Sequence, residues 1–151
     1  MILNSIKGGV MAEFKNNAVK SMVVLRKAFR TIDSKVSESF KDFELTPAQF
    51  GVLDVLYAKG SMKIGDLINS TLATSGNMTV VIKNMEKKGW ITRTPCSNDK
   101  RAFWIDLTEE GRAVIATALP AHIEKVEEAF SVLTPDEQAQ LISLLKKFKT
   151  L

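Results

Sequence analysis

The sequence predicts a mostly α-helical fold with one small β-hairpin, and three observations support that expectation. Apolar residues recur at steps of three and four over most of the 151 residues, which is the period of helices with one buried face. The period changes to two between about residues 90 and 107, as it does in paired strands. Capping signals divide the helical parts into separate segments.

The first helix is expected from near Ala12 to near Lys41, after a leader, MILNSIKGGV, that does not resemble a secretory signal. This helix is longer than a small domain needs for its own core. We therefore expect part of its apolar seam to face another chain. The seam has the spacing of a coiled coil and consists of Met22, Leu25, Phe29, Ile32 and Val36.

Two shorter helices follow. In TPAQFGVLDVLYAKG, Thr46 is the expected N-cap, Gln49 completes a capping box and Gly60 ends the helix. The expected buried side consists of Phe50, Leu53, Val55 and Leu56. In SMKIGDLINST, Ser61 is the expected cap, with Ile64, Leu67 and Ile68 turned inward.

The segment TSGNMTVVIKNMEKKGW is predicted to form a helix that begins at a cap, Thr74 or Ser75, and closes at Gly89. Its apolar stripe consists of Met78, Val81, Ile82 and Met85, so the remaining side chains point outward. The outward set is Gly76, Asn77, Thr79, Val80, Lys83, Asn84 and Lys87. Taken alone, this pattern fits equally well a solvated amphipathic helix with one stray exposed valine.

The next segments, WITR and AFWIDL, alternate across a polar loop from Thr94 to Lys100 and predict a β-hairpin with a long tip. Helix resumes from the cap Thr108, and the final helix opens with the capping box TPDEQ. That last helix is expected to bury Leu141, Leu144, Leu145 and Phe148.

Two short helices followed by a hairpin make a winged helix-turn-helix, whose second helix enters the DNA major groove. Charge agrees with this interpretation, because residues 59–104 carry eight basic and three acidic side chains within a chain of net charge +4. On the second helix, Asn77 and Thr79 could hydrogen-bond base edges, Val80 could contact a thymine methyl and the lysines could hold phosphates.

From Leu45 onward the chain resembles the MarR (multiple antibiotic resistance regulator) family of transcription factors. The resemblance rests on LTPAQFGVLDVL, SGNMTVVIKNMEKKGWITR and DKRAFWIDLTEEG. Its most specific part is the run Asp99, Lys100 and Arg101, followed at the family's spacing by Leu107, Thr108 and Gly111.

This resemblance implies a homodimer that binds a palindromic operator in double-stranded DNA, usually as a repressor, and responds to a small aromatic or amphipathic effector. Residues 45–107 would form the DNA-binding lobe, and residues 1–44 and 108–151 would form the dimer. Arg101 would reach into the minor groove while Asp99 holds the shape of the wing. The expected DNA contacts are Ser75, Gly76, Asn77, Thr79, Val80, Lys83, Asn84, Lys87, Arg93, Lys100 and Arg101.

Other functional classes have little support. The sequence has no phosphate-binding glycine loop or nucleophile elbow, and one Cys with one His makes neither a triad nor a metal site, so no enzyme and no cofactor is expected. A winged helix that serves only as a protein-interaction module is the alternative. No apolar run is long enough to span a membrane and one Cys cannot form an internal disulfide, which together favour a cytoplasmic protein.

Cys96 and His122 each have two interpretations. Cys96, in the wing loop, is either an incidental exposed thiol or a site whose oxidation disturbs the DNA contact. His122 is either an ordinary helix-surface or interface histidine or a group that senses pH or lines a ligand cleft.

Overall fold

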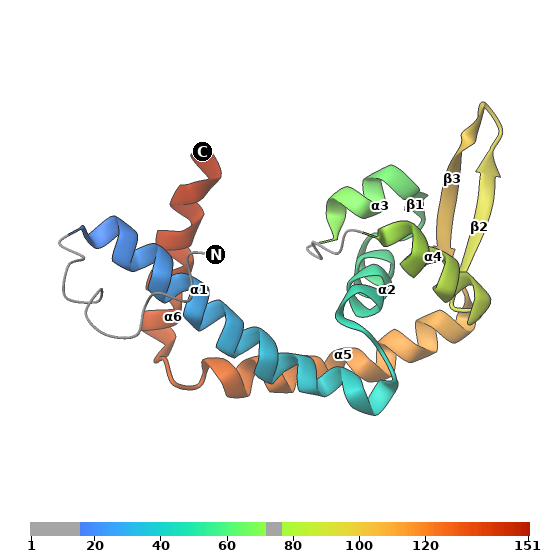
Figure 1. The fold of residues 1–151 in the computed structure, drawn as a ribbon. Coiled ribbons are helices and arrows are strands. Elements are labelled where there is room, and N and C mark those ends of the chain that lie inside the picture. Colours follow the sequence, from blue (N-terminus) through green and yellow to red (C-terminus); the bar gives the residue numbers. More distant parts are fainter. Residues whose placement is uncertain (1–15, 72–76) are drawn as a thin grey trace, which may run out of the picture. The chain divides into compact units, whose positions relative to one another are not determined.

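The computed structural model describes residues 16–71 and 77–151, and it divides the chain into two units, residues 1–35 and 36–151 (Figure 1). In the first unit, residues 17–35 belong to the helix α1 (Asn17–Val36). Asn16 caps this helix, because its side-chain oxygen accepts a hydrogen bond of 2.9 Å from the Ala18 amide. The predicted start near Ala12 lies outside the described residues.

The helix α1 ends at Val36, earlier than the predicted Lys41, because the chain tightens there into a 3₁₀-helix, η2 (Ser37–Phe43). The Ser39 hydroxyl donates to the Val36 carbonyl oxygen at 2.8 Å, and Glu44 closes the segment in the left-handed region with φ 52°. Most of the α1 seam is exposed, and Phe29 keeps 67% of its surface accessible. Such a face matches the expectation that the seam packs against another chain.

The helix α2 (Pro47–Lys59) begins as predicted. The Gln49 amide donates to the Thr46 hydroxyl and the Thr46 amide donates to the Gln49 side chain, each at 3.1 Å, which completes the capping box. Gly60 ends the helix with φ 80°, a conformation that favours glycine. Its buried side includes Val52 as well as the predicted Phe50, Leu53 and Leu56, whereas Val55 is only half-buried.

The next predicted cap is wrong. Ser61 does not begin a helix, because Met62–Lys63 form a short strand, β1, that pairs with Ile105 and Trp104 of a strand about forty residues later. The helix α3 (Ile64–Ser70) therefore starts after Lys63, without a side-chain cap. Leu67 is buried as expected, but Ile68 is exposed.

The helix α4 (Met78–Lys87) ends where the sequence predicts. Gly89, with φ 74°, allows the Trp90 amide to reach the Met85 carbonyl at 3.1 Å while its own amide donates to the Glu86 carbonyl at 3.0 Å. These two bonds form a Schellman motif, which satisfies carbonyls at the helix end. The predicted caps, Thr74 and Ser75, lie outside the described residues, so the start of the helix near Asn77 is the part that can be described.

The sheet has three antiparallel strands in the order β1-β3-β2, with β2 (Ile91–Cys96) and β3 (Asp99–Leu107) forming the hairpin, which we call the wing. The long tip predicted from Thr94 to Lys100 is wrong, because Thr94 and Pro95 pair with Trp104 and Phe103. Only residues 97 and 98 turn. A proline can belong to β2 because β2 is an edge strand, and the register shifts next to it, between Pro95 and Cys96.

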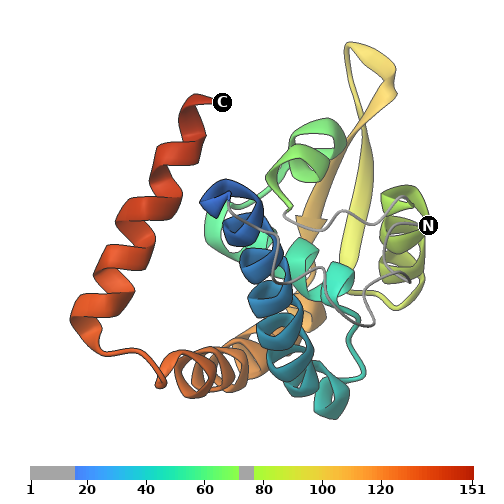
Figure 2. The same ribbon diagram turned by 60° about the vertical axis from the view of Figure 1, so that its left-hand side comes forward.

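The core lies between the sheet and the helices α2, α3, α4 and α5 (Glu109–Phe130), and the wing projects beyond it (Figure 2). The helix α5 contributes Ile115 and Ala118 to this core and continues past Pro120. The core side chains with almost no exposed surface are Val52, Leu53, Leu56, Leu67, Ile82, Met85, Ile91, Ile105 and Ile115.

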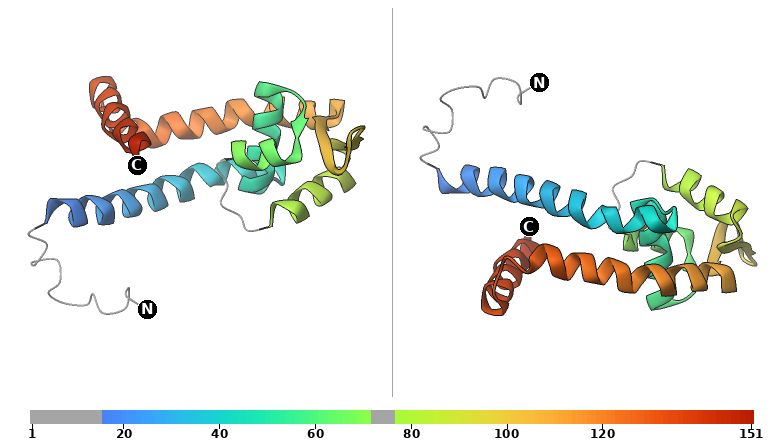
Figure 3. Two further views of the ribbon diagram at one scale, coloured as in Figure 1. Left: turned by 90° about the horizontal axis from the view of Figure 1, so that it is seen from above. Right: turned by 90° about the horizontal axis from the view of Figure 1, so that it is seen from below.

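The C-terminal helix α6 (Pro135–Lys146) begins with the predicted capping box of Thr134 and Glu137 and continues into η3 (Lys147–Thr150). It follows the end of α5 that lies away from α4 and the wing (Figure 3). The predicted burial of Leu144, Leu145 and Phe148 is wrong for the single chain, since all three are exposed and α6 has no buried residue. The described part of the single chain leaves this apolar face exposed, so its burial requires a surface outside the described residues of that chain.

No helix in the described part of the chain is both long and apolar enough to cross a membrane.

The start of α5 is held tightly against Trp90, which generates a stability prediction. A Cβ atom at Gly111 would collide with the Trp90 carbonyl oxygen, so Gly111→Ala must move backbone and should lower the free energy of unfolding by about 1–3 kcal/mol or more. Gly51→Ala in α2 is the matched control, because a Cβ there meets no atom within 4 Å and should stabilise by about 0.5–1 kcal/mol. Urea unfolding measures both, and equal stabilities would contradict the close approach.

Candidate nucleic-acid interface

The two faces of α4 divide as the sequence predicts. Met78, Ile82 and Met85 are buried, and Val81 is half-buried beside them. Val80 keeps 46% of its surface accessible although it is apolar. The exposed face, in the described part of the predicted set, consists of Asn77, Thr79, Val80, Lys83, Asn84 and Lys87. Burial of one stripe therefore leaves amide, hydroxyl, methyl and ammonium groups together on the other.

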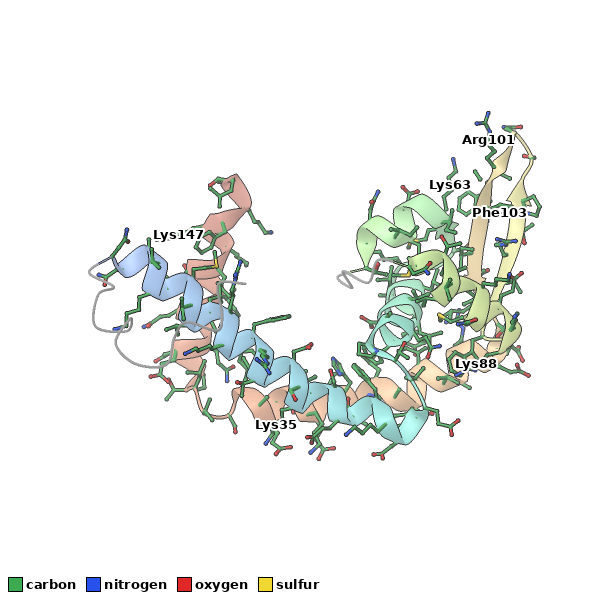
Figure 4. The ribbon with its side chains drawn as sticks, in the orientation of Figure 1. Lys35, Lys63, Lys88, Arg101, Phe103 and Lys147 are labelled. Carbon is green, nitrogen blue, oxygen red and sulfur yellow. The ribbon has the colours of Figure 1, made fainter. Side chains whose placement is uncertain are left out.

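Two of the predicted DNA contacts, Ser75 and Gly76, lie outside the described residues, and Lys100 belongs to β3. Lys63 on β1 was counted in the basic region but was not predicted as a contact. In the sheet Lys63 pairs with Trp104, and it extends on the same side of the lobe as the wing tip (Figure 4). The pairing of β1 with β3 brings this lysine to the wing, and a two-residue strand leaves almost no pattern in the sequence.

The wing tip carries Arg101, whose side chain projects away from the lobe (Figure 4). The Arg101 backbone amide donates to the Asp99 carboxylate at 2.9 Å. This hydrogen bond spans the first residues after the turn, so it restrains the backbone that carries the guanidinium. In the part of the chain that the structure describes, no carboxylate forms an ion pair with that guanidinium.

Arg93 is held on two sides. Its guanidinium carbon lies 4.3 Å from the centre of the Phe103 ring, within the range of a cation–π contact, and its Nε lies 3.8 Å from a carboxylate oxygen of Glu86. Arg93 belongs to β2, Phe103 to β3 and Glu86 to α4. Neither Phe103 nor Glu86 is among the site residues that the sequence predicts. The contact with Phe103 can be predicted only when the strand register is known. That register places Arg93 opposite Ile105.

Cys96 is neither in a loop nor fully exposed. It ends β2, is half-buried, and lines a hollow of about 300 Å³ with Lys63, Trp104 and residues of the wing tip. Trp104, on the same hollow, keeps 43% of its surface accessible. The thiol is therefore only partly exposed, and it lies at the end of a strand and not in the predicted loop.

His122 is part of a packed aromatic cluster rather than an ordinary surface histidine. Its ring stacks on Phe40 at 5.1 Å with an angle of 15° and lies 4.5 Å from the ring of Phe50. The Nδ1 atom lies 3.5 Å from the Ser39 hydroxyl oxygen, which already donates its proton to the Val36 carbonyl. Nδ1 must therefore be the donor in that contact. Burial lowers the pKa of His122, and the charge of Asp54, which is the smaller of the two effects, raises it.

Two consecutive helices, α3 and α4, are followed by a projecting hairpin that completes a three-stranded antiparallel sheet with β1. This arrangement defines a winged helix-turn-helix protein, with α4 as its second helix. Comparison with known proteins agrees. The sequence pattern of the MarR family matches residues 45–103. The HTH-type transcriptional regulator YkoM of Bacillus subtilis is 36% identical over 124 residues, which are 82% of this chain and 80% of that protein. The chain belongs to the MarR family and is a DNA-binding transcriptional regulator.

Solved structures of two further relatives are similar in fold. A mutant MarR from E. coli complexed with operator DNA is 27% identical, with a TM-score of 0.78 over 90% of this chain and 97% of that one. BpsR of Bordetella bronchiseptica, whose DNA binding is regulated by 6-hydroxynicotinic acid, is 25% identical, with a TM-score of 0.78 over 86% and 98% of the two chains.

The lowered pKa of His122 generates a prediction, which is simple to test because the chain has a single histidine. The folded state favours the neutral ring, so stability should be complete above the unfolded pKa of about 6.5 and should fall as pH drops below it. Nuclear magnetic resonance should show the His122 ring titrating with a midpoint below 6.5. His122→Phe keeps an aromatic ring and should lack this loss of stability between pH 7 and 5.5. A midpoint at or above 6.5 would contradict the preference of the folded state for a neutral His122 ring.

Proposed function

We propose that this regulator is a homodimeric repressor that binds a palindromic operator through α4 and the wing and is released by a small-molecule effector. One observation carries the proposal: an exposed face of Asn, Thr, Val and Lys side chains on α4 stands beside a hairpin with an arginine at its tip. A helix of this composition suits base edges in a major groove, and an arginine suits the adjacent minor groove. As a regulator of transcription it would act where its DNA lies, in the cytoplasm.

The division of labour that we propose assigns residues 45–107 to DNA and residues 1–44 and 108–151 to the dimer. The exposed apolar side chains support it, because large ones gather on both flanking segments, including Phe29 on α1 and Leu144 and Phe148 at the C-terminus. A second copy related by two-fold symmetry would cover such faces, and two lobes so related would match a palindromic site.

Release by an effector is supported by one relative, since the DNA binding of BpsR is regulated by 6-hydroxynicotinic acid, a small aromatic acid. An effector of this regulator would belong to a similar class of small aromatic or amphipathic molecules. It can weaken operator binding only through its different affinity for the two states, typically about 1–3 kcal/mol.

The alternative function is a winged helix that binds only proteins. Arg101 argues against it, since an interaction module has no need of an arginine that projects from a hairpin tip. Selection of bound sequences from random duplex DNA, combined with sedimentation at micromolar concentration, separates the two. The proposed function expects a dimer and a palindromic consensus. No enrichment, or a monomer that still selects a palindrome, would contradict it.

Contacts from α4 should divide into base readers and phosphate holders. Asn77→Ala or Val80→Ala should weaken binding to the selected operator by about 1–3 kcal/mol and change binding to random duplex little. Lys87→Ala should weaken both and reduce the salt dependence, because phosphate contacts release counterions from any sequence. Fluorescence anisotropy at several salt concentrations measures this. Equal losses on both DNAs for all three variants would mean that α4 does not read bases.

Arg101 should act through the shape of its guanidinium and not through charge alone. A narrow minor groove concentrates negative potential, and a planar, weakly hydrated guanidinium enters it more readily than an ammonium group. Arg101→Lys should therefore lose affinity for the operator on the order of tenfold, about 1.4 kcal/mol, and Arg101→Ala only slightly more. Full operator affinity in a folded, dimeric Arg101→Ala protein would contradict the wing mechanism.

A further inference from the structure

We infer that Glu86 competes with DNA phosphates for Arg93. In the free protein the Glu86 carboxylate pairs with the Arg93 guanidinium, and this pairing lowers the affinity of the regulator for the sugar–phosphate backbone. The inference rests on the proposed function and goes beyond it. It assigns an affinity-lowering role to a carboxylate on the same helix that reads DNA.

The first step is where Arg93 lies. Its guanidinium contacts the Phe103 ring of the wing and its Nε faces Glu86 of α4, so Arg93 bridges the helix and the hairpin. When one of these elements enters the major groove and the other the adjacent minor groove, the DNA strand that separates the two grooves passes between them. In the proposed complex, the side chain that bridges the two elements would therefore lie near that strand.

The second step is what holds the guanidinium in place. Phe103 is half-buried and packs against the core, so its ring is a fixed platform. A guanidinium over an aromatic face keeps its planar edge available for hydrogen bonds. Arg93 is therefore positioned before DNA arrives, with Glu86 as its present charged partner.

The third step is that Glu86 can be displaced. The Arg93–Glu86 separation of 3.8 Å is long for an ion pair, and the two side chains keep 39% and 40% of their surfaces exposed. Exposed pairs of this kind are weak. A phosphate offers a guanidinium two charge-assisted hydrogen bonds, so it is the stronger partner when the backbone comes within reach. Binding then separates the ion pair and leaves the Glu86 carboxylate beside DNA, and both effects reduce affinity.

The role of Glu86 would be independent of sequence. Phosphate contacts carry no base information, so the competitor should weaken binding to operator and random duplex by the same factor. The affinity for the DNA backbone would thereby stay low, while the side chains of α4 that contact bases would still distinguish the operator from random duplex.

The experiment measures the affinity of the full-length protein for the selected operator and for random duplex, by fluorescence anisotropy over a series of salt concentrations. Glu86→Gln keeps the shape of the side chain and removes its charge. It should tighten binding to both DNAs by about two- to fivefold, the range expected for a weak exposed pair, and leave their ratio unchanged. The slope of log affinity against log salt should become steeper by up to about 0.9.

Two controls distinguish the replacement of Glu86 by a phosphate at Arg93 from the general effect of removing a negative charge. Glu109→Gln removes an exposed carboxylate at the start of α5 and should have a much smaller effect. In an Arg93→Gln background, which should itself bind both DNAs more weakly, Glu86→Gln should tighten binding no more than Glu109→Gln does. Circular dichroism checks that every variant remains folded.

Three results would overturn the inference: no tightening in Glu86→Gln, equal tightening with and without Arg93, or unchanged binding in Arg93→Gln. Each is distinguishable from failure of the proposed function. If the wild-type protein selects an operator but any of these results is found, only the role of Glu86 is wrong. If the wild-type protein shows no salt-dependent binding to duplex DNA, the proposed function fails first.

Discussion

The joint at Gly89, Trp90, Thr108 and Gly111 is the constraint on which the winged-helix lobe depends. The Thr108 hydroxyl donates to the Gly89 carbonyl at 2.6 Å and accepts from the Gly111 amide at 3.0 Å, while the Thr108 amide donates to the Trp90 carbonyl at 3.0 Å. One residue thus ties the end of α4 and the start of β2 to the end of β3 and the start of α5. The lack of a side chain at Gly111 permits the approach. This joint, together with the shared core of Met85, Ile91 and Ile105, fixes the relation between the helix and the wing.

Apolar burial then decides which chemistry faces outward. Met78, Ile82 and Met85 enter the core from α4, and Ile105 enters it from β3. Because helical and strand side chains have fixed periods, those anchors determine the direction of every intervening residue. The polar face of α4 and the guanidinium of Arg93 are consequences of core packing, with Phe103 contributing to both the core and the support of the arginine.

Much of this fold could be predicted because its signals are local. The capping box at Thr46, the stops at Gly60 and Gly89 and the buried stripe of α4 each depend on residues within a few positions of one another. The strand β1 could not be predicted, since its pairing partners lie about forty residues away. The hairpin was predicted too short because Pro95 and its polar neighbours have the composition of a loop, and only their register with β3 makes them a strand.

For the candidate site, too, local features could be predicted from the sequence and contacts between distant elements could not. Asn77, Val80 and Arg101 could be singled out from periodicity, composition and a family resemblance. The contacts of Arg93 with Phe103 and Glu86 could not, because they join three elements and depend on distances that no spacing in the sequence reveals. The sequence predicts correctly that α6 has one apolar face. Whether that face is buried depends on which other surfaces pack against it, and a single sequence does not contain this information.

The proline in β2 also affects the tendency of such a regulator to aggregate through its sheet edge. A hairpin that projects from its lobe presents backbone groups along an edge strand, and edges of this kind can recruit strands from other molecules. Pro95 has no N–H to offer, and the register shift beside it interrupts the regular ladder. The wing can therefore project from the lobe, as the proposed contact with a DNA groove requires, while remaining a poor template for sheet growth between copies of the protein.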